Sequence, residues 1–130
     1  MPSEPISNEL AAKYQDTVVE IFFDDAVVNP DELFEIWKSD FYMITASNPF
    51  SQIHSENENE ERNQVLFNLL HPEHPEILSG LGRSPDGSWA EKGWVVRSSN
   101  PEEIIALAKK FEQNAIFKFG SSGKEVIKCL

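Results

Sequence analysis

The sequence predicts a single α+β domain with a mixed or antiparallel sheet and about three helices. The chain has 130 residues, the length of one domain, and 40% of them are hydrophobic, so it can bury a core without disulfides. Runs rich in β-branched and aromatic residues alternate with segments of helical periodicity. Their order is roughly β-α-β-α-β-β-α-β-β, and we expect an N-terminal arm over residues 1–14 before a domain over residues 15–130.

The first elements are two strands with a helix between them. Residues 17–28 are rich in β-branched and aromatic side chains, which predicts one strand. A helix begins after Asn29, because Asn caps, Pro30 fits the first turn and Glu32 can reach back to the cap. Residues 41–46 are apolar on both faces and bounded by polar residues, which predicts a central strand buried on both sides.

Two further helices are expected later in the chain. Ser55 and Glu58 have the spacing of a capping box, and the helix that they begin runs to about residue 70. Asn100 repeats the Asn-Pro-x-Glu pattern of a helix start.

Two pairs of strands complete the predicted sheet. Residues 76–82 and 88–97 are separated by Pro, Asp and Gly in the order that favours a turn. Residues 114–119 and 124–130 flank a short Gly/Ser segment, which predicts a last hairpin.

Charge and cysteine usage exclude several classes of partner. The net charge of −11, from 22 acidic and 11 basic residues, repels a phosphate backbone, so we expect no nucleic-acid partner. No apolar run approaches the roughly 18 residues of a membrane span, and the N-terminus lacks the pattern of a signal peptide. Cys129 is the single cysteine, which excludes an internal disulfide. We therefore expect no membrane partner and a cytoplasmic location.

The polar loop that follows the strand over residues 41–46 is the first candidate site. A central strand that ends at a polar loop before a helix is where open sheets usually place a ligand. Thr45 lies at the end of this strand and Asn48 in the loop. No acidic residue follows Asn48-Pro49, unlike the other two Asn-Pro pairs, so Asn48 either shapes the loop or points into a pocket.

Asn59 and Arg62 form a second candidate group on the helix that follows. Steps of three and four along this helix give Asn59, Arg62, Leu66 and Leu69, so the polar pair continues an apolar stripe toward the loop. An arginine at the edge of a core needs a carboxylate, a carbonyl or a ligand anion for its planar donors. Arg62 is therefore either a structural clamp on the loop or part of an anion site.

Glu91 is the candidate acid or base. Trp89, Glu91, Gly93 and Val95 alternate onto one face of a predicted strand, with Trp94 on the other. A glutamate between a tryptophan and a glycine is either half-buried with a perturbed pKa or simply exposed.

Other chemistries have little support in the sequence. His71 and His74 flank two prolines, but two histidines do not make a metal site, and His54 is isolated. Neither a Gly-rich phosphate loop nor a nucleophile with a base is recognisable. We therefore expect neither a metal nor a cofactor.

Four short motifs in order resemble those of a known family. They are Thr45-Ala46-Ser47-Asn48-Pro49, Asn59-x-x-Arg62, Asp86-Gly87-x-Trp89-x-Glu91 and Phe111-x-Gln113-x-Ala115-x-Phe117. Over about residues 41–119 the chain resembles a family of small, uncharacterised bacterial proteins, a domain of unknown function. The resemblance implies a bacterial cytoplasmic domain without an assigned activity. It adds weight to Thr45, Asn48, Asn59, Arg62, Trp89, Glu91 and Gln113. The chain departs from the family's pattern at Lys92-Gly93-Trp94, where a small-residue and aliphatic run is expected.

Two classes of function follow from these residues. The first is a binding or regulatory module with a polar pocket for a small polar ligand or a partner protein, its ligand-binding residues being Thr45, Asn48, Asn59, Arg62, Trp89 and Gln113. The second is a small hydrolase or transferase in which Glu91 is the acid or base and Arg62 and Asn48 orient an anionic substrate. The enzyme requires Glu91 in a cleft that Arg62 and Asn48 also line.

Overall fold

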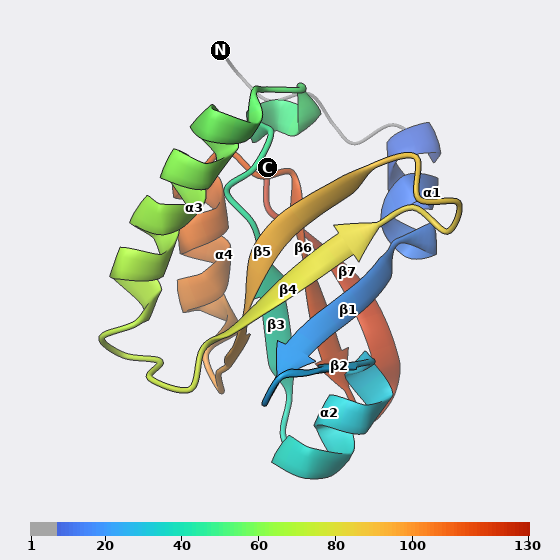
Figure 1. The fold of residues 1–130 in the computed structure, drawn as a ribbon, viewed down its shortest axis with the longest axis vertical. Coiled ribbons are helices and arrows are strands. Elements are labelled where there is room, and N and C mark those ends of the chain that lie inside the picture. Colours follow the sequence, from blue (N-terminus) through green and yellow to red (C-terminus); the bar gives the residue numbers. More distant parts are fainter. Residues whose placement is uncertain (1–7) are drawn as a thin grey trace.

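A computed structural model of the chain describes the backbone of residues 8–130 and the side chains of residues 12–130. Over this range four α-helices and seven strands form one domain, which confirms the predicted α+β class (Figure 1). The helices are α1 (Asn8–Asp16), α2 (Pro30–Trp37), α3 (Glu56–Leu70) and α4 (Pro101–Lys110). The strands are β1 (Val18–Phe23), β2 (Ala26–Val28), β3 (Phe41–Ile44), β4 (Leu78–Arg83), β5 (Ala90–Arg97), β6 (Ala115–Gly120) and β7 (Gly123–Lys128). The sequence predicted about three helices and six strands, and α1 and β2 are the additional elements. A short 3₁₀ turn, η1 (Pro49–Ser51), lies between β3 and α3.

All seven strands belong to one antiparallel sheet. Its strand order is β2-β1-β4-β5-β3-β6-β7. β3 lies between β5 and β6, and each of its four residues is buried, which confirms the prediction of a strand covered on both faces. The sequence left open whether the sheet is mixed or antiparallel, and each strand pair is antiparallel.

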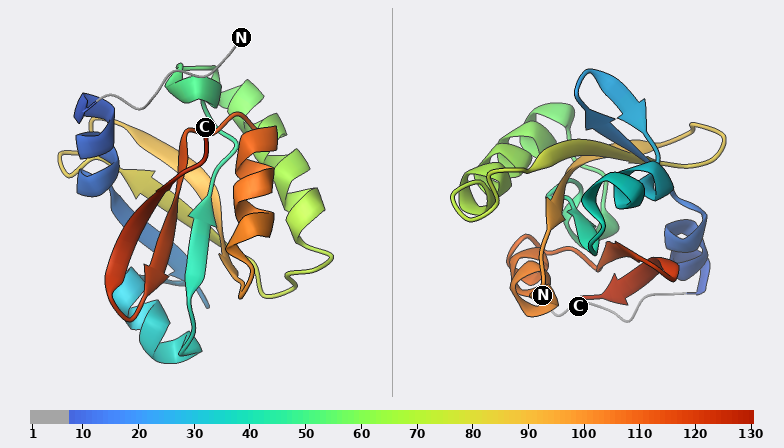
Figure 2. Two further views of the ribbon diagram at one scale, coloured as in Figure 1. Left: turned by 180° about the vertical axis from the view of Figure 1, so that it is seen from behind. Right: turned by 90° about the horizontal axis from the view of Figure 1, so that it is seen from below.

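The two faces of the sheet carry separate hydrophobic cores. On one face α3 and α4 lie side by side, and Tyr42 and Ile44 of β3 pack there against Leu66 and Ile104 (Figure 2). The other core contains Phe41 and Met43 of β3, Val95 of β5, Phe119 of β6 and Leu33 of α2. This second face is the inner face of a curved sheet, as the view from below in Figure 2 shows, and we call it the concave face.

The backbones of two neighbouring strands approach closely at the centre of the sheet. A Cβ atom on Gly93 of β5 would lie 2.7 Å from the backbone oxygen of Ile44, so no larger residue fits there without a shift of the strands. At the far edge, Nζ of Lys124 in β7 donates to the carbonyl oxygens of Tyr14, Gln15 and Thr17, at 3.2, 2.6 and 2.8 Å. These bonds attach the end of α1 to the opposite wing of the sheet. α2 therefore lies at one end of the concave face and α1 at the other (Figure 1).

All three predicted helix starts agree with the structure, and two of them have the expected side-chain cap. Asn29 and Glu32 form the predicted capping box, and Ser55 accepts a hydrogen bond from the backbone of Glu58. α4 begins at Pro101 with Asn100 at the N-cap position, as predicted, but the Asn100 side chain makes no capping hydrogen bond. Its backbone N–H instead donates to the Ser98 hydroxyl, so the serine organises this turn.

Two other predictions of local structure need correction. Residues 17–28 form a hairpin and not one strand, since Asp24 and Asp25 take φ values of 48° and 63° in a two-residue turn between β1 and β2. On α3 the buried stripe contains Leu70, whereas Leu69 is 43% exposed. The sequence therefore placed Leu69 in the buried stripe, whereas the structure places Leu70 there.

Candidate functional site

A cavity of about 440 Å³ opens on the concave face at its α1 end. Its inner surface includes Met43 of β3, Gly82 of β4 and Phe117 of β6. Six of the seven residues that the sequence analysis singled out line it: Thr45, Asn48, Asn59, Trp89, Glu91 and Gln113. The seventh, Arg62, does not. The end of β3 therefore leads into a cavity, as the sequence predicts for the end of a central strand.

Asn48 is the centre of the hydrogen bonds around this cavity. Its Oδ1 accepts from the backbone N–H of His54 and from Nδ2 of Asn59, both at 2.9 Å. Its own backbone N–H donates to Oδ1 of Asn59 at 2.9 Å, so the two asparagines are joined in both directions. The remaining amide group, Nδ2, donates to Oε1 of Glu91 at 3.0 Å. Asn48 thus both shapes the loop and lines the cavity, which were the two alternatives left open by the sequence.

These bonds determine how Glu91 presents its carboxyl group. Because Oδ1 of Asn48 already receives two N–H donors, its Nδ2 must face Glu91, and Oε1 of Glu91 must act as an acceptor. Oε2 has no protein partner within residues 12–130. Among these residues, Oγ of Ser39 is the only fully buried side-chain atom without a hydrogen bond, so Oε2 of Glu91 must be partly accessible. Oε2 is therefore the oxygen that faces the cavity, and the proton of the neutral acid favours it.

Burial changes the acidity of two groups on this cavity. It raises the pKa of the Glu91 carboxyl above its ordinary value, and the hydrogen bond from Asn48 offsets only part of that effect. Burial also raises the pKa of the Tyr14 hydroxyl; the hydrogen bond with Ser51 lowers it, and the nearby Glu91 raises it further. Glu91 is therefore half-buried with a perturbed pKa, the first of the two alternatives for this residue.

The loop between β3 and α3 has an unusual backbone. Asn48, Phe50 and Ser51 take positive φ values of 48°, 56° and 59°, a region that residues other than glycine rarely adopt. The backbone N–H of Phe50 donates to the carbonyl oxygen of Glu112 at 2.7 Å, which holds the loop against the segment after α4. Such outliers persist only where the surrounding structure enforces them, and they cluster at binding sites.

Thr45 and Gln113 use their polar groups to hold the same loop. The Thr45 hydroxyl donates to the carbonyl oxygen of Lys92 at 2.6 Å and accepts from the backbone N–H of Ser47 at 3.0 Å. Nε2 of Gln113 donates to the carbonyl oxygens of Ser47 and Phe111 at 3.0 and 3.2 Å. Both residues line the cavity, but the Thr45 hydroxyl and the Nε2 group of Gln113 already bond within the protein.

Arg62 is a clamp between the loop and the end of α4. Its Nε donates to the carbonyl oxygen of Ala46 at 2.7 Å. One terminal nitrogen donates to the carbonyl oxygen of Phe111 at 2.6 Å. The other terminal nitrogen lies 3.7 Å from the Glu112 carboxylate, and the guanidinium lies over the Phe111 ring. These contacts match the clamp alternative. The cleft that contains Glu91 and Asn48 does not include Arg62.

Comparison with known proteins gives a family for this fold and cavity. A family model described as "Protein of unknown function (DUF3293)" matches residues 44–116, more than half of the chain. The chain belongs to this family. The resemblance to an uncharacterised domain family is thus confirmed, and the family description names no activity. Neither a search of curated proteins nor one of solved structures gave a match.

The region matched by DUF3293 contains most of the cavity but not all of it. It runs from the end of β3 into β6 and includes the seven residues singled out by the sequence. Tyr14 of α1 and Phe117 of β6 also line the cavity and lie outside the matched region.

Three residues with roles at this site were missed by sequence reasoning. Tyr14 was assigned to the N-terminal arm, yet its hydroxyl lies 3.2 Å from that of Ser51. Asn63 is buried, accepts from the backbone N–H of Ala46 at 2.8 Å and donates to Oγ of Ser47 at 2.8 Å. Its position four residues after Asn59 was a usable signal, since both lie on the buried side of α3. His54 lines the cavity, and no local pattern indicated this.

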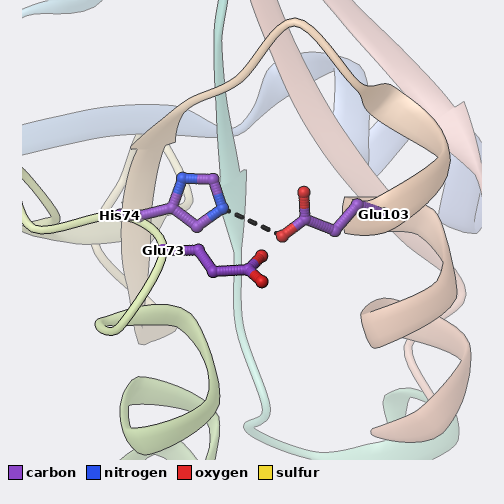
Figure 3. A group of neighbouring side chains, drawn as sticks. All are labelled: Glu73, His74 and Glu103. Carbon is purple, nitrogen blue, oxygen red and sulfur yellow. Dashed lines mark hydrogen bonds and ion pairs between the residues drawn. The ribbon is translucent and has the colours of Figure 1, made fainter.

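A second cluster of polar residues lies away from the cavity. Glu73 and His74, after α3, meet Glu103 of α4, and their ligand atoms lie within 4.8 Å of one another (Figure 3). Nε2 of His74 is 3.0 Å from Oε1 of Glu103, so this pair connects the ends of α3 and α4. His71, which the sequence places beside His74, is not in the cluster.

No helix in the described part of the chain is both long and apolar enough to cross a membrane.

Proposed function

We propose that this domain binds a small polar ligand in the cavity on its concave face, where the ligand meets Oε2 of Glu91. The observation that carries this proposal is the state of the Glu91 carboxyl. One oxygen is held by Asn48, and the other faces a cavity without a protein partner among the described residues.

The energetics of a buried carboxyl support a ligand role. A polar group that is taken out of water without a partner costs about 1–3 kcal/mol, and a charged one costs more. A residue such as Gln at this position would keep the shape and lower that cost. The presence of an acid at this position therefore favours a role in binding a ligand.

The size and construction of the cavity support the same proposal. Pockets for small molecules typically enclose about 300–1,000 Å³ and combine apolar walls with a few oriented polar groups. The present cavity of about 440 Å³ has an apolar inner surface at Met43 and Phe117. Its polar groups, Asn48 and Glu91, are fixed by a loop with strained backbone, which is a means of orienting them in advance.

A small hydrolase or transferase is the second candidate. The free oxygen of Glu91 favours this candidate. Since Oε1 is held by Asn48, Oε2 can donate a proton to a molecule in the cavity or accept a proton from that molecule. Burial moves the pKa of this carboxyl upward, the direction expected of an acid that works near neutral pH. Arg62 would not orient the substrate in this version, because its donors contact Ala46 and Phe111.

Filling the cavity tests the binding proposal. Ala115 lies on the same face of β6 as Phe117 by strand alternation, so Ala115→Leu adds a side chain inside the cavity. Ala106→Leu makes the same change at an exposed position of α4 and is the matched control. We expect a fragment library to shift the NMR signals of Asn48, Trp89 and Glu91 in the parent and in Ala106→Leu, but not in Ala115→Leu. Equal binding by both variants would contradict the proposal.

Turnover separates the two candidates. Parent protein and Glu91→Gln are incubated with small ester, amide and phosphoester substrates. The binding module predicts no turnover in either protein. Hydrolysis by the parent that falls at least about 100-fold in Glu91→Gln, the usual contribution of an acid or base, would establish the enzyme instead.

We also propose the setting that the composition favours, a bacterial cytoplasm with no nucleic-acid or membrane partner. The net charge of −11 and the single cysteine support it. The division into an arm over residues 1–14 and a domain over residues 15–130 remains part of this proposal.

A further inference from the structure

The charges around Glu91 indicate which class of ligand suits the cavity. Burial raises the pKa of Glu91, and the only opposing influence is the hydrogen bond from Asn48, not a positive charge. None of the ion pairs formed within residues 12–130 includes Glu91. The carboxylate therefore lacks the counter-charge that a buried acid normally has.

The basic side chains near the cavity do not supply this counter-charge. Lys13 lines the cavity from α1, but Lys13 is exposed to solvent and forms no ion pair with Glu91. Nδ1 of His54 lies 3.0 Å from the Glu58 carboxylate and is thus already paired. Nζ of Lys124 is held by three backbone carbonyl oxygens at the end of α1.

Aromatic rings line the same cavity as the carboxylate. Tyr14 and Trp89 contribute to its walls and Phe117 to its inner surface. Aromatic faces attract cations, and a carboxylate beside such faces is a common arrangement for the recognition of ammonium and guanidinium groups. Phe117 already interacts in this way with the protein's own ammonium group, since Nζ of Lys124 lies 5.3 Å from its ring centroid.

The field of the whole protein favours the same class of ligand. The net charge is −11, and a second acidic residue, Glu56, also lines the cavity. An anion would approach against this field, whereas a cation is attracted by it. A neutral ligand gains nothing from the field, and from the carboxylate it gains a hydrogen bond but no ion pair.

We infer that the ligand is a small organic cation whose ammonium or guanidinium group pairs with Oε2 of Glu91 and lies against Trp89 and Tyr14. This inference rests on the proposed binding function and names the class of ligand for that site. The apolar part of the ligand lies against Met43 and Phe117 in the interior of the cavity. Asn48 holds the carboxylate in place through Oε1 and leaves Oε2 for the cation.

Three probes of nearly equal shape test the inference. They are n-butylammonium, n-butanol and butyrate, titrated at neutral pH into the full chain and followed by the NMR signals of the Asn48 side-chain amide and the Trp89 indole. We expect n-butylammonium to bind at least about tenfold more tightly than n-butanol, which corresponds to about 1.4 kcal/mol. We expect butyrate to bind more weakly than either.

A matched pair of variants assigns this preference to one carboxylate. Glu91→Gln should lower the affinity for n-butylammonium about tenfold and leave that for n-butanol unchanged. Glu60→Gln removes the same charge from an exposed position on α3 and should preserve both affinities. A parent-like NMR spectrum of Glu91→Gln verifies that this variant is folded.

Two results would overturn the inference. Equal binding of n-butanol and n-butylammonium, or a preference that survives in Glu91→Gln, would show that charge at Glu91 does not select the ligand. The absence of binding by all three probes would also refute it. The proposed binding function is judged separately, by the fragment library and Ala115→Leu, because that experiment does not depend on the charge of the ligand.

Discussion

The two ends of the concave face are built by the same strands but packed in opposite ways. At the α2 end the core beneath the helix is filled: Leu33 is fully buried, and the Phe41 and Phe119 rings stack with their centroids 5.2 Å apart. A second hollow of about 480 Å³ lies between α2 and the β6–β7 turn, but its acidic lining residues, Asp31 and Glu35, are exposed. At the α1 end the same sheet surrounds a cavity of about 440 Å³ with a buried carboxyl group, Glu91. Protein interiors are normally close-packed, with few voids larger than a water molecule. A cavity that contains a buried acid, as at this open end, is therefore an exception that needs a cause.

The difference between the two ends shows which part of the molecule stabilises the fold and which part lowers its stability. The filled end buries apolar surface, which is the dominant favourable contribution to folding. The open end combines a buried acid, a cavity and the positive φ angles of Asn48, Phe50 and Ser51, each of which costs free energy. Proteins retain such features at functional sites. The following variants test whether the two ends differ as this account requires.

Truncation at the filled end should have the largest effect. Leu33→Ala removes a fully buried side chain and should lower the stability by about 2–5 kcal/mol. For a domain of this size that lowers Tm by roughly 8–20 °C in a calorimetric scan. Ile36→Ala on the same helix is the control, because Ile36 is 51% exposed. Similar losses for the two variants would mean that α2 does not close a packed core.

Removal of the clamp should have the next largest effect. Arg62→Ala leaves the carbonyl oxygens of Ala46 and Phe111 without their donor, which costs about 1–3 kcal/mol and lowers Tm by roughly 3–8 °C. Gln64→Ala, at an exposed position on α3, should change Tm by less than about 2 °C. An unchanged Tm for Arg62→Ala would return this residue to the list of candidate ligand contacts.

Neutralising the acid at the open end should stabilise the protein, and the gain should depend on pH. Because the pKa of Glu91 is raised on folding, its contribution to stability is full below its unfolded pKa and is lost as the pH rises through the folded pKa. Glu91→Gln avoids this loss, so its Tm should exceed that of the parent by a few degrees, on the order of 2–5 °C, at pH 7. The gain should shrink at pH 4.

The matched control for this variant is Glu60→Gln, whose side chain is exposed. Its Tm should equal that of the parent at both pH values. If Glu91→Gln were less stable than the parent at pH 7, the carboxylate would be a stabilising group and the contrast between the two ends would fail.

Added volume should be tolerated at the open end and not on a packed face. Ala115→Leu extends into the cavity and should change the stability by less than about 1 kcal/mol. Ala108→Leu inserts the same atoms into the core beneath α4, where Ala108 is fully buried, and should cost about 1–3 kcal/mol. Equal costs in chemical denaturation would show that the cavity is not available space.

Features determined by neighbouring residues could be predicted from the sequence. The Asn29–Glu32 capping box and the two-sided burial of β3 depend on residues within a few positions, and both are confirmed. The turn at Asp24-Asp25 was missed because positive φ angles are usually signalled by glycine or asparagine, and neither is present there. The alternation of Glu91 and Trp94 onto opposite faces follows from the period of a strand and agrees with the two cores.

Features that depend on long-range geometry could not be predicted. Tyr14 meets Ser51 only because Lys124 holds the end of α1 against the far wing of a curved sheet. No local pattern reports this curvature. The sequence also placed Arg62 at the edge of the core but left its acceptors open, because the carbonyl oxygen of Phe111 lies 49 positions away in the chain.

The most direct test of the account is the titration of the Glu91 side chain, followed by the ¹³C signal of its carboxyl group. We predict a pKa above the ordinary glutamate value of 4.5, because burial without a counter-charge disfavours the ionised form. We predict further that n-butylammonium lowers this pKa, since the cation binds the ionised form. A pKa at or below the ordinary value, unchanged by the probe, would show a solvated carboxylate and contradict the account of the open end as a binding site.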